Sequence, residues 1–149
     1  MSEQGQQTPH ADEQRLIAFL SAQPDVAAAY LFGSRATGRD ISRSDIDIAV
    51  LLHDDSEPSG CIERRLELAR HLDRLADRPV DVVVLNTAPL VLRHQVLVTG
   101  RLLYEGDTAA RVNFEVRTGK LYADLRPMRE FFRATLFEEI REGRLGQRR

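Results

Sequence analysis

The chain has 149 residues, of which 42% are hydrophobic and 30% charged, and its formal net charge is −2. These values are typical of one soluble globular domain and give no overall electrostatic attraction to nucleic acid or to an anionic membrane. No apolar run is long enough to span a bilayer and the first residues are polar, so we expect no membrane span, no signal peptide and a cytoplasmic location.

The first third of the chain is expected to hold one helix and two strands. Thr8 before Pro9 is typical of a helix start, and this helix should run to about Gln23. Val26–Phe32 is an apolar run typical of a buried strand. Asp45–Leu52 begins with alternating polar and apolar residues, which indicates a second strand with one wet end.

The rest of the chain continues the alternation of helices and strands. We expect a helix from about Ser59 to Ala76, a strand at Val80–Leu85, a helix at Pro89–Thr99 and a short strand at Arg101–Tyr104. From Asp107 onward apolar residues keep helical spacing, and Pro127 should kink or divide that segment.

Two of the expected helices have apolar stripes that indicate their buried faces. The stripe of the helix near 59–76 comprises Ile62, Leu66, Ala69, Leu72 and Leu75. The stripe of the helix near 89–99 comprises Leu90, Val91, His94 and Leu97 or Val98. Both stripes should pack against the sheet.

Three aspartates are the candidates for metal binding and catalysis. Asp45 and Asp47 point to one side of a strand, because side chains alternate, and their Cα atoms lie about 7 Å apart. Two such carboxylates repel each other unless a cation intervenes, and oxygen ligands at this spacing suit Mg²⁺. Asp81 interrupts an apolar strand, and it would complete a site for two ions if that strand lies beside the first.

Gly33 and Ser34 follow the first strand and suit a phosphate. Glycine lets the backbone approach a phosphate closely, and a serine hydroxyl can donate a hydrogen bond to its oxygens. Arg35, Arg39 and Arg43 follow in the same polar stretch, where one of them could reach a triphosphate.

The motifs resemble the nucleotidyltransferase superfamily related to DNA polymerase β, whose signature is Gly-Ser, a spacer, Asp-x-Asp and a later acidic strand residue. More narrowly, the segments 33–38, 44–50, 80–86 and 100–105 resemble the minimal nucleotidyltransferases that serve as MntA-type antitoxins in bacterial toxin-antitoxin pairs. The resemblance covers residues 26–107. The long C-terminal helical segment matches no motif of that family.

The resemblance implies an α+β nucleotidyltransferase fold, with a mixed β-sheet flanked by helices and a C-terminal helical extension. It implies that Gly33, Ser34, Arg35 and Ser44 bind the nucleotide, with Asp45, Asp47 and Asp81 catalytic on two Mg²⁺ ions. ATP would be the co-substrate, and the acceptor a tyrosine of a HEPN-domain ribonuclease toxin that AMP addition silences.

The expected domain organisation has three parts. A flexible N-terminus spans residues 1–8, a nucleotidyltransferase domain spans 9–106, and a helical extension with a basic tail spans 107–149. Aromatic residues on this extension exceed one narrow stripe, which favours a partner surface. They are Phe114, Tyr122, Phe131, Phe132 and Phe137.

Two other functions remain open at this point. The acceptor could be a small molecule, as for antibiotic-modifying nucleotidyltransferases, or the protein could neutralise a toxin by binding alone. Partners other than ATP and a toxin are not expected: neither a membrane nor nucleic acid is favoured. Cys61 and the four histidines lack the spacing of metal ligands and are interpreted as structural.

Overall fold

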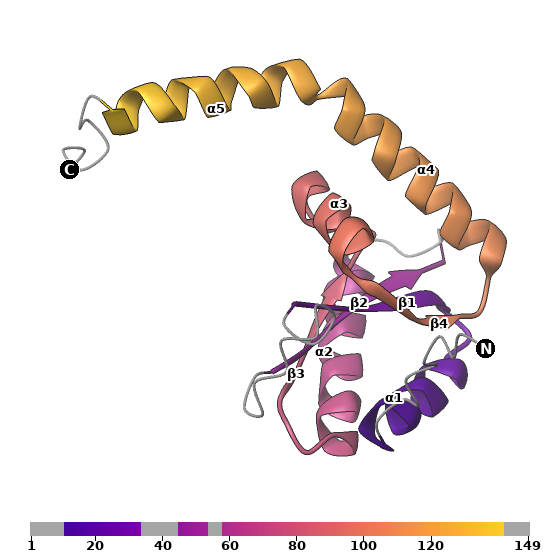
Figure 1. The fold of residues 1–149 in the computed structure, drawn as a ribbon. Helices are drawn as coiled ribbons and strands as arrows, with labels where there is room; N and C mark the ends of the chain where they lie inside the picture. The colour runs from indigo at the N-terminus through magenta and orange to yellow at the C-terminus, as the bar shows by residue number, and fades with distance from the viewer. Residues whose placement is uncertain (1–10, 34–44, 54–57, 142–149) are drawn as a thin grey trace, which may run out of the picture.

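Four strands form one mixed sheet in the computed structural model, which describes residues 11–33, 45–53 and 58–141 (Figure 1). The strands are β1 (Val26–Phe32), β2 (Ile46–Leu52), β3 (Val80–Val84) and β4 (Arg101–Glu105). The helices are α1 (Ala11–Ser21), α2 (Pro58–Leu75), α3 (Leu90–Thr99), α4 (Thr108–Asp124) and α5 (Arg126–Arg141). The predicted α+β class, the mixed sheet and the C-terminal helices are confirmed.

The strand order is β3-β2-β1-β4, with β1 antiparallel to both of its neighbours and β2 parallel to β3. Parallel neighbours need a crossover connection, and α2 supplies it between β2 and β3. This arrangement brings the beginnings of β2 and β3 together at the edge where β1 ends. The acidic residues of both strands therefore share one end of the sheet.

Helices α1 and α2 cover one face of the sheet, and α3 and α4 lie on the other, called here the α1/α2 face and the α3/α4 face (Figure 1). On the α1/α2 face, Ile48 of β2 packs with Leu16 and Leu72, all fully buried. On the α3/α4 face, the strands contribute small residues such as Ala49, which pack under Val96 and Phe114.

The expected stripe of α2 is partly wrong. Leu72 is buried as expected, but Ile62 is 60% exposed, and the other buried residues are Cys61 and Leu68. Apolar residues on α2 form two overlapping stripes, and the crossover onto the sheet selects the one that contains Cys61. This burial fits the structural interpretation of the cysteine.

The expected stripe of α3 is also wrong in part. Val96 is the buried residue of this helix, whereas Val91 and Val98 are exposed. The helix has apolar residues around most of its circumference, so periodicity cannot select a face. Packing between the sheet and α4 selects Leu92 and Val96, four residues apart, together with Leu97, which was one of the expected alternatives.

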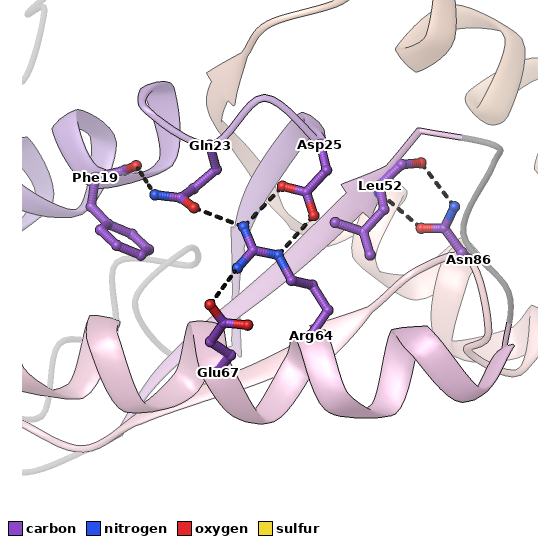
Figure 2. A network of polar contacts seen from close by, with 7 residues as sticks. All are labelled: Phe19, Gln23, Asp25, Leu52, Arg64, Glu67 and Asn86. Atoms are coloured by element: carbon purple, nitrogen blue, oxygen red, sulfur yellow. Dashed lines mark hydrogen bonds and ion pairs between the residues drawn. The ribbon is translucent and has the colours of Figure 1, made fainter.

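A polar contact holds the turn between α1 and β1 to α2 (Figure 2). The Arg64 guanidinium donates two hydrogen bonds to the Asp25 carboxylate, at 2.7 and 2.9 Å, and a third to the Gln23 side chain at 2.7 Å. The bonds to Arg64 hold the pKa of Asp25 below its usual value. Glu67 lies on the other side of the guanidinium, 3.3 Å from Nη1.

Helices α4 and α5, here called the C-terminal arm, leave the sheet and extend away from it (Figure 1). Asp107 caps α4 by accepting a hydrogen bond from the Ala110 amide at 3.0 Å. Pro127 lies in the first turn of α5, where its missing amide costs nothing, so the predicted division of the segment is confirmed.

Apolar side chains follow the solvent side of the arm. They include Leu121, Leu125, Met128 and Phe131, of which the last is 67% exposed. Two of the aromatic residues expected at a partner surface instead have neighbours within the fold, since Phe114 is buried against the sheet and Tyr122 stacks on His94. No helix in the described part of the chain is long and apolar enough to cross a membrane.

Candidate active site

Three aspartates and one glycine lie together where β1 ends and β2 and β3 begin. Asp47 pairs with Phe32 of β1 on one side and with Asp81 of β3 on the other. Asp45 immediately precedes β2, two residues before Asp47, so both side chains lie on the α3/α4 face. Asp81 could join this group only if its strand lay beside β2, and the pairing of β2 with β3 meets that condition.

The three carboxylates influence each other electrostatically. Burial raises the pKa of Asp47, and the nearby negative charges of Asp81 and Asp45 raise this pKa further. A carboxylate in this position becomes more stable when a cation is near. Gathering negative charge at this end of the sheet therefore costs folding stability.

Gly33 closes the site on the β1 side. Its φ is +76°, in the left-handed region that glycine adopts without strain. A Cβ atom added to Gly33 would collide with Oδ2 of Asp47, so no other residue fits without displacing that carboxylate. The glycine therefore permits both the turn after β1 and the close approach of Asp47.

The donor set fits magnesium in its chemistry. Asp45, Asp47 and Asp81 offer only carboxylate oxygens, the ligands that Mg²⁺ prefers. Burial first and the charges of Asp81 and Asp45 second raise the pKa of Asp47, and a cation would offset both effects. As the side chains stand in residues 11–33, 45–53 and 58–141, no three acidic, histidine or cysteine groups close around one point. The carboxylates would have to rotate inward to share an ion.

The other residues expected at the nucleotide lie outside the described part of the chain. These are Ser34, Arg35 and Ser44, together with the alternative arginines Arg39 and Arg43. Among the expected site residues, the structure thus brings together Gly33, Asp45, Asp47 and Asp81.

Sequence reasoning did not select the polar side chains that lie farther along the α3/α4 face. Arg93 and Thr118 line a cavity there, and neither belongs to a recognisable motif. A threonine inside the apolar stripe of α4 is a weak signal that only burial makes visible.

The fold and this site define a class of protein. Carboxylates on neighbouring strands, beside a glycine turn at one end of a mixed sheet, suit an enzyme that transfers a phosphorus-containing group with the help of divalent cations. The model of the family described as polymerase beta, nucleotidyltransferase matches residues 14–109. The chain belongs to this nucleotidyltransferase family.

A curated relative narrows the comparison. The protein adenylyltransferase MntA of Shewanella oneidensis is 36% identical over 120 residues, which cover 80% of this chain and 83% of that protein. The resemblance to MntA-type nucleotidyltransferases is thereby confirmed.

Solved structures of similar proteins agree. A chain of a toxin-antitoxin complex with AMP-PNP is 33% identical, with a TM-score of 0.69 over 84% of this chain and 98% of that one. A chain in the complex of tri-AMPylated Shewanella oneidensis HEPN toxin with MNT antitoxin is 31% identical, with a TM-score of 0.62 over 85% and 96% of the two chains. The predicted nucleotidyltransferase fold is thus confirmed.

Proposed function

We propose that this chain is an antitoxin-type nucleotidyltransferase that transfers AMP from ATP to a tyrosine of a cognate HEPN-domain toxin and so silences the toxin. The observation that carries the proposal is the position of Asp47, partly buried between Gly33 and Asp81 and flanked by Asp45. The similarity to an adenylyltransferase and to chains of toxin-antitoxin complexes supports the choice of acceptor.

The reaction is an in-line displacement at the α-phosphorus of ATP. The tyrosine oxygen forms a bond to this phosphorus while the bond from phosphorus to the oxygen bridging the β-phosphate breaks, and pyrophosphate leaves. The phenol proton passes to a carboxylate. Asp45, Asp47 and Asp81 lie together at this end of the sheet, and one of them accepts this proton.

Asp45, Asp47 and Asp81 are the residues that would hold two Mg²⁺ ions. Bound there, the ions would neutralise charge on the triphosphate and favour ionisation of the acceptor hydroxyl. The protein supplies the positions of the carboxylates, which the pairing of Asp47 with Asp81 across β2 and β3 fixes. Gly33 lets the turn after β1 come close to the Asp47 carboxylate, which a larger residue would displace.

The roles of the remaining residues follow the resemblance. Ser34, Arg35 and Ser44 contact the nucleotide, with the Arg35 guanidinium offsetting phosphate charge. Residues 9–106 form the catalytic domain, and residues 107–149 meet the partner. Since ATP is an intracellular co-substrate, the reaction takes place in the cytoplasm.

The rival functions differ in what happens to the toxin. An antitoxin that acts by binding alone would use the exposed apolar residues of the C-terminal arm and leave the toxin unmodified. An enzyme with a small-molecule acceptor would neither bind nor modify a toxin. Both alternatives predict a toxin of unchanged mass.

The deciding experiment is intact-mass spectrometry of the proposed cognate HEPN-domain toxin, after incubation with this protein, ATP and Mg²⁺. We expect mass increments of whole AMP units on a tyrosine, absent with the Asp45→Asn, Asp47→Asn variant. The exposed Asp77→Asn variant is the matched control and should behave as the wild type. A stable complex with no added mass would instead identify an antitoxin that acts by binding.

A further inference from the structure

A cavity of about 220 Å³ lies on the α3/α4 face, away from the carboxylates. Its polar lining comes from Asn86 after β3, Arg93 of α3 and Arg117 and Thr118 of α4. Leu51 forms its floor on β2 and points to the same face as Asp47, four residues earlier. The cavity therefore lies about 13 Å along the strand from Asp47.

Arg93 brings a fixed positive charge to the cavity. Its Nε donates to the Ala88 carbonyl and one Nη donates to the Asn86 carbonyl, both at 2.8 Å. The guanidinium carbon lies 5.9 Å from the centre of the Phe114 ring. Carbonyls orient this cation without neutralising it, and no carboxylate pairs with it in the part of the chain that the structure describes.

The loop that orients Arg93 is itself held in place (Figure 2). The Asn86 side chain accepts a hydrogen bond from the Leu52 amide at 2.8 Å and donates one to the Leu52 carbonyl at 2.9 Å. This pair extends the contact between β2 and β3 to Asn86, two residues after the end of β3. Its consequence is that the guanidinium is pre-organised, so little ordering is required when a ligand binds.

Thr118 lines the same cavity and is buried. The residue is 1% exposed, and its hydroxyl makes no hydrogen bond to any residue within 11–33, 45–53 or 58–141. Threonines elsewhere on these helices behave differently, since the hydroxyls of Thr99 and Thr135 donate to carbonyls one turn earlier. A buried hydroxyl without a partner is costly, which indicates that a ligand supplies the partner.

A fixed guanidinium beside a free hydroxyl donor suits a carboxylate. Nε and Nη2 of Arg93 already donate to carbonyls, which leaves Nη1 to donate to an incoming group. The two oxygens of a carboxylate can accept from such a guanidinium nitrogen and from a hydroxyl. The one carboxylate of α4 in the adjoining turn, Glu115, is already bound by Tyr30 at 2.7 Å and by Arg111 at 3.0 Å, so it is committed elsewhere. Since no carboxylate of residues 11–33, 45–53 and 58–141 bonds to Arg93, a carboxylate of another molecule is the candidate partner.

A polypeptide is the source that the surroundings favour. Leu121 lines the cavity and is also one of the exposed apolar residues of the C-terminal arm, together with Leu125 and Met128 farther along it. A protein that lies on the arm therefore reaches the cavity first and the carboxylates of β2 afterwards, along one face. The separation of about 13 Å corresponds to roughly four extended residues.

We propose that the cavity between α3 and α4 binds an acidic side chain of the acceptor toxin, and that this contact positions the toxin for AMP transfer at Asp45 and Asp47. This inference rests on the proposed function. The nucleotide is the competing occupant, because a base extending from the carboxylates could lie in the same direction.

Steady-state AMP transfer to the proposed HEPN-domain toxin tests this. The Thr118→Val variant keeps the shape of the side chain and removes its hydroxyl, and we expect the KM for the toxin to rise roughly tenfold while kcat and the KM for ATP stay within about twofold. Thr118→Ser should restore the wild-type KM. Thr99→Val, on an exposed site of α3, is the matched control.

Folding and pairing are checked separately. The melting temperature of Thr118→Val should equal or exceed that of the wild type, because an unpaired buried hydroxyl is removed. An Asp→Asn and Glu→Gln scan of the toxin should find one residue whose effect on KM is not additive with that of Thr118→Val.

The outcomes separate the two proposals. Suppose that the wild type transfers AMP. If Thr118→Val then has an unchanged KM for the toxin, or an altered KM for ATP instead, the cavity assignment is wrong and AMP transfer still holds. A scan in which no acidic residue couples to Thr118 does the same. No transfer by the wild type removes the proposed function, and the cavity assignment with it.

Discussion

The two faces of the sheet use the same strands for different purposes. On β2, Ile46, Ile48, Val50 and Leu52 point to the α1/α2 face and are almost completely buried. Their alternating neighbours Asp47, Ala49 and Leu51 point to the α3/α4 face, which carries the carboxylates and the cavity. Large aliphatic side chains stabilise one face, whereas small and polar ones leave space and charge on the other.

The difference shows how a small domain separates stability from function. The α1/α2 face closes its core with α1 and α2 and holds the intervening turn with Arg64. The α3/α4 face accepts costs, namely like charges around Asp47 and the unpaired hydroxyl of Thr118. Substitutions on the two faces should therefore have opposite signatures in activity and stability.

Removing the carboxylates should have the largest effect. In Asp45→Asn, Asp47→Asn we expect AMP transfer to fall about a thousandfold or more, because metal-assisted charge stabilisation contributes several kcal/mol to the barrier. Without divalent cations, the melting temperature should stay equal or rise, since like charges are removed. Transfer rates and melting curves test both expectations, with Asp77→Asn as the control. A lower melting temperature in the double variant would show that these carboxylates stabilise the fold.

A core substitution on the α1/α2 face should show the reverse pattern. Leu72→Ala removes a fully buried side chain from this face and should lower the free energy of unfolding by about 2–5 kcal/mol. Transfer at temperatures where the variant stays folded should be within about twofold of wild type. Urea unfolding and transfer rates measured on one preparation test this prediction, with Leu66→Ala, at an exposed position, as the control. A large loss of transfer rate in the folded variant would show that the α1/α2 face also contributes to catalysis.

Gly33→Ala should affect both properties. The added Cβ collides with the Asp47 carboxylate and the φ of +76° strains any other residue. We expect about 1–3 kcal/mol of destabilisation from the backbone alone, together with a severe loss of transfer as Asp47 is displaced. Gly119→Ala, on α4 where a Cβ meets open space, is the control. Full activity in Gly33→Ala would mean that Asp47 does not need its present position.

The smallest effect concerns pH and the turn between α1 and β1. Hydrogen bonds from Arg64 lower the pKa of Asp25 in the folded protein. The ionised carboxylate therefore stabilises the fold at pH values above its unfolded pKa of about 3.9. This stabilisation is lost as the pH falls through the lower pKa of the folded state. Because the pair is partly exposed, we expect Asp25→Asn to cost less than about 1 kcal/mol at pH 7. Near pH 2 the difference from wild type should vanish. Denaturant curves at both pH values measure this difference in the free energy of unfolding, with Glu67→Gln as a comparison. The same difference at both pH values would contradict the prediction.

Periodicity and residue type predicted much of the fold. The strand at Val26–Phe32 has the expected bounds, and the described ends of the elements up to β4 differ from the expected ends by one or two residues at most. The expected helix start at Thr8 and Pro9, and the N-terminal segment 1–8, lie outside the described residues. The faces of α2 and α3 were harder to predict, because apolar residues occur on more than one side of each helix and only tertiary packing selects among them. Val91 was expected to be buried and is exposed for this reason, and of the alternatives Leu97 and Val98 it is Leu97 that packs against the core.

The aspartates of the candidate site could be predicted from the sequence, whereas the residues of the cavity could not. The alternation of Asp45 and Asp47 on a strand indicates a shared side from the sequence alone, and the parallel pairing of β2 and β3 then places Asp81 beside Asp47. Nothing in the sequence indicates that Arg93, Asn86 and Thr118 line one cavity, since they come from three separate segments. Contacts of this kind depend on the packing of α4 against the sheet.

AMP transfer by the carboxylates is tested most simply with ATP labelled at a chosen phosphate. With wild-type protein, Mg²⁺ and the proposed HEPN-domain toxin, label from the α-phosphate should become covalently attached to the toxin and label from the γ-phosphate should not. Asp45→Asn, Asp47→Asn should incorporate neither label. Attachment of the γ-phosphate label, or equal incorporation of the α-phosphate label by the double variant, would contradict AMP transfer by the carboxylates of the α3/α4 face.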